Sequence, residues 1–325
     1  MKTKLASVLS RKQSTGGGAV AHIIRISDYT SRYQTDIQRY SSQFTRMKKE
    51  RWHYMQESWK REFAETVRLE YEELTESSAI AEVWSKAVNK VRNWTTRGHE
   101  QKNEKEREHE AFQQTKQLFR DEIFEKQLLW AGVPDAELLN QDQMIDWKQD
   151  QWLKQLGIEL PDNCFLFYKP VLYVKKAEIE LDTVLITPTE IICLTRLDGE
   201  ALSVFEVNSD RYWIEYVNQE RRKRLSPIPA LERMERVIGN ILSQHDRSMP
   251  VRSIVIAANS IIDHRTIGMK VDFLDKRSFS DWKSKLVHSN IPLKHQQVKA
   301  CETLLQYCES RESIERNSAE LEMFS

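Results

Sequence analysis

The amino-acid sequence predicts a mixed α/β domain preceded by a region of long, partly coiled-coil-like helices. The first observation behind this prediction is the distribution of helix-breaking residues, since no proline occurs before Pro134 and no glycine lies between Gly18 and Gly98. The second is the pattern after Pro134, where runs rich in β-branched and aromatic residues precede amphipathic helices and further strand candidates. Strands and helices mixed in this order are typical of an α/β domain.

Residues 28–133 form the predicted helical region, because apolar residues recur there at steps of three and four. A skip in the spacing near residue 50 resembles a coiled coil with a stutter. Further helices are expected at about 78–94 and 102–130. The helical spacing favours packing of the tryptophans against a partner helix, from this chain or a second copy, over stacking on nucleic-acid bases. The first stripe comprises Ile37, Tyr40, Phe44, Met47, Trp52, Met55, Trp59, Phe63 and Val67.

Residues 1–27 are expected to form a disordered basic tail. This segment contains basic residues and no acidic one, together with the glycine run Gly16–Gly18. Such a composition buries too little apolar surface to offset the entropy lost on ordering. A solvated tail is the simpler interpretation, and an arm that contacts nucleic acid or a membrane is the alternative.

Residues 140–325 form the predicted α/β domain, which ends in a C-terminal helix. Runs of β-branched and aromatic residues separated by short polar turns are typical of an antiparallel meander, and apolar residues at helical spacing predict the helices. The expected elements are a helix at 147–156 ending at Gly157, strands within 165–174, 178–187, 190–197 and 201–207, a helix over 231–242, strands at 253–258 and 270–274, a helix at 281–288 and a last helix that carries Cys301 and Cys308.

Composition excludes several classes of protein. Lys plus Arg and Asp plus Glu each number 49, so the formal net charge is zero, which argues against binding nucleic acid by overall charge. There is no apolar run of transmembrane length, and no apolar segment of a secretory signal follows the basic start. The four cysteines form no CxxC pair and indicate buried thiols. We therefore expect a cytoplasmic protein with no membrane partner.

Residues 147–288 resemble the nuclease-related domain, NERD, in the order of their elements and in a few residues. Glu180–Pro188 is similar to the aspartate-bearing strand and its turn, Asp198-Gly199 to the glycine turn, and Trp213 to the tryptophan of a later strand. Ser226-Pro227 stands where Asn-Pro is expected before a helix. The resemblance covers less than half of the chain and implies a restriction-endonuclease-like fold.

The resemblance also implies metal-assisted phosphodiester cleavage, with two carboxylates holding Mg²⁺ and a lysine assisting. Asp182 matches the first carboxylate, whereas the Glu-x-Lys motif is replaced by Leu194-Thr195-Arg196. Leucine cannot bind a metal, and arginine cannot act as a base. Gln149 and Asp150 both lie near the position of the helix glutamate. The residual catalytic positions are therefore Asp182, Glu180 and Arg196, and the sequence argues against an active enzyme.

Two other clusters leave alternatives open. Glu178, Glu180 and Asp182 alternate, so on one strand they would share a face and could hold a metal, with Asp182 as the metal ligand; the simpler interpretation is an acidic solvent face. The basic cluster Arg221, Arg222, Lys223 and Arg224 is expected in a loop, where it could contact nucleic-acid phosphates or be balanced by neighbouring glutamates.

The sequence thus predicts a non-catalytic interaction or scaffolding protein built on a nuclease-related domain, without a cofactor. Its partner would be another protein, or a second copy bound through the N-terminal helices. The alternatives are a metal-dependent DNA nuclease that uses Mg²⁺, and a DNA-binding module that does not cleave.

Overall fold

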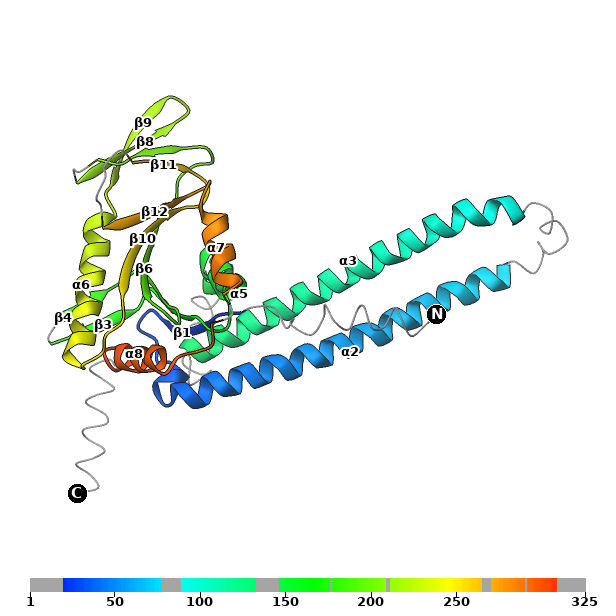
Figure 1. Ribbon diagram of the computed structural model, residues 1–325, viewed down its shortest axis with the longest axis horizontal. Coiled ribbons are helices and arrows are strands. Elements are labelled where there is room, and N and C mark those ends of the chain that lie inside the picture. Colours follow the sequence, from blue (N-terminus) through cyan, green and yellow to red (C-terminus); the bar gives the residue numbers. More distant parts are fainter. Residues whose placement is uncertain are drawn as a thin grey trace, which may run out of the picture. The chain divides into compact units, whose positions relative to one another are not determined.

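A computed structural model describes residues 20–77, 89–132, 146–175, 177–208, 211–264, 270–289 and 291–308 (Figure 1). Two compact units divide the chain. One contains Phe44–Ile123, and the other combines Ala19–Gln43 with Phe124–Ser325. The predicted mixed α/β class is confirmed. The expected helix at 78–94 lies outside the described residues up to residue 88.

The first unit consists of most of α2 (Ile37–Ser77) and most of α3 (Asn89–Gly132). Trp52 packs against Phe119 and Phe112, and Trp59 packs against Phe112, with ring centroids 4.9, 5.9 and 5.2 Å apart. The partner of a later α2 residue lies earlier in α3, so the two helices run antiparallel. For Trp52 and Trp59, the partner observed is another helix of the same chain, whereas Trp84 lies outside the described residues.

The second unit is organised around a six-stranded sheet in the order β1-β2-β5-β6-β10-β12. β2, β5 and β6 are joined antiparallel, while β1, β10 and β12 add parallel strands to that centre. The strands are β1 (His22–Ile26), β2 (Phe165–Tyr168), β5 (Thr183–Ile186), β6 (Ile191–Arg196), β10 (Val251–Ala257) and β12 (Val271–Asp275).

Helices cover both faces of this sheet (Figure 1). On one face, α6 (Ile228–Gln244) and α8 (His295–Gln306) bury leucines and isoleucines against alternate residues of the strands. On the other, α5 (Gln151–Glu159), α7 (Phe279–Val287) and the last turns of α3 pack against the remaining residues. The central strands are therefore buried on both sides, which explains their continuous apolar runs.

Two smaller sheets complete the unit. β3 (Val171–Val174) and β4 (Ala177–Glu180) form a two-stranded ribbon. A four-stranded sheet has the order β11-β7-β8-β9, with β9 at its edge. Its strands are β7 (Val204–Glu206), β8 (Tyr212–Val217), β9 (Glu220–Leu225) and β11 (Ile261–Asp263).

The predicted basic tail at 1–27 is wrong at its end, because His22–Ile26 form the fully buried strand β1. Arg25 is only 1% exposed and donates hydrogen bonds to three backbone carbonyls and to the Gln34 side chain, so this cation is structural. A short 3₁₀ helix, η1 (Arg32–Gln34), follows. Residues 1–19 lie outside the described part of the chain.

Two further expectations differ from the structure. The predicted meander is divided between two sheets, because β3 and β4 form a separate ribbon beyond Lys169, whose φ is +48°. The predicted stop at Gly157 is a point of close packing instead. A Cβ on Gly157 would lie 3.1 Å from Ile23 and 3.2 Å from Phe124, so α5 continues through a glycine that lets neighbouring side chains approach.

Candidate functional site

Asp182 lies between β4 and β5, beside the carboxyl ends of β2 and β6. Its carbonyl accepts a hydrogen bond from Lys169 N at 2.9 Å, and its Oδ1 accepts one from the Thr183 hydroxyl at 3.3 Å. Burial raises the pKa of the Asp182 carboxyl, although the Thr195 and Thr183 hydroxyls and the charge of Lys169 oppose the rise. Burial therefore disfavours the charged form of the Asp182 carboxyl, and the neighbouring donors and cation partly offset this effect.

Glu178 and Glu180 do not accompany Asp182 on one strand. Both are exposed and lie in β4, opposite Tyr173 and Val171 of β3. Asp182 lies just after β4, where its carbonyl pairs with Lys169 N, and it is half-buried whereas Glu178 and Glu180 are exposed. The shared acidic face therefore stays a prediction.

Leu194 takes the position where the resemblance places a metal-binding glutamate. It is fully buried in β6, between Thr183 of β5 and Ile254 of β10, in the core that α5 covers. Arg196, two residues later, lies 2.6 Å from Asp198 Oδ1 through Nε, and its guanidinium carbon is 5.3 Å from the Trp152 ring centre. Leucine at this position therefore contributes to packing, and the neighbouring cation is held by an acid and an aromatic ring.

Asp150, one of two candidates for the helix acid, has a structural role. Its Oδ1 accepts from Trp152 N at 3.0 Å and from Leu153 N at 3.1 Å, which caps α5. Its Oδ2 accepts from the Tyr168 hydroxyl at 2.5 Å. Burial, followed by this hydrogen bond, raises the pKa of Tyr168 well above its ordinary value. Both oxygens of Asp150 are thus engaged in holding α5 against β2.

These donors do not fit a Mg²⁺ site of the expected kind. Such a site needs carboxylates from two elements that converge on one ion, whereas Leu194 offers no oxygen, Glu180 is in the ribbon and Asp150 is a helix cap. Over the ranges that the structure describes, no three His, Cys, Asp or Glu side chains are grouped so that they could hold a metal ion.

The basic cluster Arg221–Arg224 forms most of strand β9, so the expected loop is wrong. All six residues of β9 are exposed, because an edge strand outside the core has solvent on both faces. A two-residue turn at Asn218 and Gln219 joins β9 to β8, and both turn residues have positive φ, +48° and +72°. The turn has the backbone signature of a type I′ hairpin.

The four cations of β9 have different environments. Arg222 lies 2.5 Å from Glu200 and 3.2 Å from Glu220, and Arg224 lies 2.6 Å from the buried carboxylate of Glu215. Arg221 is placed over the Tyr216 ring at 5.6 Å. Within the described residues, Arg221 and Lys223 have no carboxylate partner. Within that part of the chain, Arg222 and Arg224 are therefore paired with carboxylates, whereas Arg221 and Lys223 are not.

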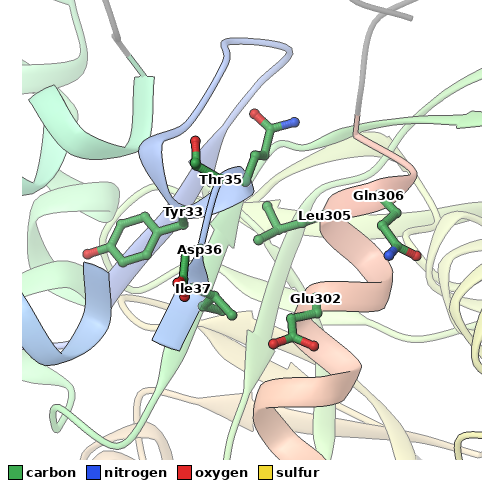
Figure 2. Close-up of a pocket in the computed structure, with 8 residues that line it drawn as sticks. Tyr33, Thr35, Asp36, Ile37, Glu302, Leu305 and Gln306 are labelled. Atoms are coloured by element: carbon green, nitrogen blue, oxygen red, sulfur yellow. The ribbon is translucent and has the colours of Figure 1, made fainter. Parts of the chain in front are cut away.

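A cavity of about 230 Å³ lies between the residues that lead into α2 and one side of α8 (Figure 2). Its carboxylates are already engaged, since Asp36 Oδ1 accepts from Arg39 N at 2.8 Å and Glu302 lies 2.6 Å from Lys299. Figure 2 shows the Tyr33 ring turned away from α8. None of the candidate site residues named from the sequence lines this cavity.

Comparisons with family models, curated proteins and solved structures found no match to this chain. None of the helices in the described ranges combines the length and apolar character that crossing a membrane requires.

Proposed function

We propose that this chain is a non-catalytic interaction or scaffolding protein whose α/β unit derives from a nuclease-related, restriction-endonuclease-like fold. The observation that carries the proposal is Leu194, which is fully buried in β6 at the position of the expected metal-binding glutamate. In this proposal α2 and α3 pack as a coiled-coil-like pair and present a surface to a protein partner.

The chemistry around Leu194 supports loss of catalysis. Cleavage of a phosphodiester by this route needs a metal that activates water and a cation that stabilises the developing charge. Asp182 alone cannot supply the ligand set, and the Arg196 guanidinium is paired with Asp198. In this proposal, the residues at the positions of the expected catalytic groups contribute to packing and pairing instead.

A cleavage assay tests the proposal. Purified protein is incubated with Mg²⁺ or Mn²⁺ and a mixture of single-stranded, double-stranded and nicked DNA, and we expect no cleavage. Isothermal calorimetry with each metal is expected to show no binding heat that depends on Asp182. Cleavage, or metal binding, that disappears in Asp182→Ala would establish the rival nuclease hypothesis.

The second candidate is a DNA-binding module that does not cleave, and the exposed cations of β9 favour it. Its test is the dependence of DNA affinity on salt. Neutralising Arg221, Arg222, Lys223 and Arg224 should reduce the slope of log affinity against log salt if these residues contact phosphates. An unchanged slope would reject β9 as a DNA contact.

Self-association through the helices is the remaining partner hypothesis. The Trp52 and Trp59 rings of the apolar stripe already pack on Phe112 and Phe119 of α3. A dimer would therefore need other surface of α2 or α3. Light scattering that shows only monomer at tens of micromolar, roughly the range of a weak interface, would remove this hypothesis.

A further inference from the structure

β9 presents an open sheet edge that carries four cations in succession. It is the last strand of the order β11-β7-β8-β9, and its six residues are exposed. The edge strand β1 of the main sheet differs, because a side chain of the same chain bonds to its outer edge. At the outer edge of β1, the Gln127 side chain accepts from Ile23 N at 3.0 Å and donates to Ala21 O at 2.8 Å. One sheet edge is thus covered by the chain itself, whereas nothing in the described ranges bonds to the outer edge of β9.

The hairpin register identifies which backbone groups of β9 point outward. Antiparallel pairs alternate between those that exchange hydrogen bonds and those that do not. Ser226 N donates to Arg211 O at 2.9 Å, which marks that pair as hydrogen-bonded. Counting in steps of two along the pairs assigns hydrogen bonds to Arg224, Arg222 and Glu220. The N–H and C=O groups of Arg221, Lys223 and Leu225 therefore point away from β8.

The same three residues set the character of the outer sheet face. Their side chains lie beside Tyr216, Ile214 and Tyr212 of β8, the half-exposed and exposed positions of that strand. Leu225 is 63% exposed and Tyr212 is 45% exposed, so the face is apolar at one end. Arg221 and Lys223 supply positive charge over the rest.

We propose that β9 binds an extended acidic peptide segment of a partner protein, which adds as a fifth strand. This inference rests on the proposed interaction function and names the class of partner. Main-chain groups of Arg221, Lys223 and Leu225 pair with the peptide backbone. Acidic side chains at every second position of the peptide face Arg221 and Lys223, and an apolar residue packs on Leu225.

Charge selects this occupant over a second copy of β9. Two such strands side by side would bring the Arg221 and Lys223 cations of one copy against those of the other, and like charges on an edge oppose self-pairing. A strand with alternating acids brings the opposite charge to the same backbone groups. Nucleic acid would use the cations but has no need of outward N–H groups at alternate positions, and this difference makes the two partners separable.

The experiment uses the full chain and a fluorescent eight-residue glutamate–valine peptide, followed by anisotropy. One face of the peptide carries glutamates at successive alternate positions and valine at the alternate position that faces Leu225. Lys223→Gln should weaken binding by about two- to fivefold, the range for one exposed ion pair. Lys223→Pro also removes an outward N–H while sparing every bond to β8, and should weaken binding by about a further tenfold. Arg233→Gln, an exposed cation on α6, serves as the matched control and should leave affinity unchanged.

A second measurement does not depend on folding of the proline variant. Two peptides are methylated at backbone nitrogens along one edge or the other of the strand. Against wild-type protein, we expect one of the two to lose binding and the other to retain it, because only one edge pairs with β9. A lysine–valine peptide should not bind.

Four results would overturn the proposal. They are absence of glutamate–valine peptide binding, equal affinity of the Lys223→Gln and Lys223→Pro proteins, indifference to methylation at both peptide edges, and tighter binding of a single-stranded oligonucleotide than of the peptide at the same salt concentration. The last would assign β9 to nucleic acid. DNA cleavage is a separate readout, so failure of peptide binding leaves the non-catalytic proposal standing, and cleavage would refute only that proposal.

Discussion

Replacing Arg25 by alanine is expected to destabilise the α/β unit more than any substitution of an exposed arginine. The Arg25 guanidinium donates from Nε to Ser27 O at 3.1 Å, from Nη1 to Gln34 Oε1 at 2.7 Å, and from Nη2 to Asp28 O at 2.6 Å and Cys308 O at 2.7 Å. These bonds join β1 to the segment before α2 and to the end of α8.

The magnitude follows from what the alanine leaves behind. Hydrogen bonds to a charged group contribute about 1.5–3 kcal/mol each, but contributions within one network do not add. In the alanine variant, several backbone carbonyls lose their hydrogen-bond donor in a buried region, where Arg25 is 1% exposed. We therefore expect a loss of about 3–5 kcal/mol, which for a unit of this size lowers the melting temperature by roughly 10 °C.

The assay is urea unfolding of the full chain, with hydrogen exchange of β1 and β2 as a local readout. Arg25→Lys should recover part of the loss, because one ammonium cannot reach all four acceptors. Arg233→Ala is the control and should change stability by less than about 0.5 kcal/mol. If Arg25→Ala unfolds at the same urea concentration as Arg233→Ala, the structural role assigned to this buried cation is wrong.

Three further predictions concern single positions. Gln219→Gly should stabilise the hairpin by about 1 kcal/mol, because glycine adopts a φ of +72° without strain, and thermal unfolding would show no gain if the turn were different. The native state holds a proton on Asp182 more tightly than the unfolded state, so stability falls as pH rises from 3.8 through the raised pKa. Asp182→Asn should therefore raise the melting temperature at pH 7 and lose that advantage near pH 3–4; an equal difference at both pH values would contradict this. Trp52→Ala should cost the α2–α3 pair about 3 kcal/mol, seen as lost helicity on mild heating, whereas exposed Tyr54→Ala should not.

Elements whose pattern is local could be predicted from the sequence. The apolar spacing from Leu231 to Leu242 lies within α6, and the run Ser253–Ala257 lies within β10. In both cases the residues that determine the structure are neighbours along the chain. Both elements are buried on a wide face, so periodicity and burial agree.

The missed features depend on distant residues. β1 pairs with β2, more than a hundred residues away, and the apolar run around His22–Ile26 was outweighed by the basic and glycine-rich residues before it. Four successive cations are typical of a loop, yet in β9 they occupy an edge strand without burying charge. For the site, the sequence located Asp182 and Leu194 but not the division of this hairpin between two sheets, because that division depends on the pairing of β4 with β3 and of β5 with β2.

The placement of β1 has a consequence for the time course of synthesis. About 140 residues separate the end of β1 from the start of β2, its neighbour in the sheet. At about 5–20 residues per second, β1 leaves the ribosome roughly ten to thirty seconds before its neighbour exists. During that interval five residues that end fully buried are exposed to the cell. Chaperones can therefore bind β1 in the nascent chain until β2 has been made and can pair with it.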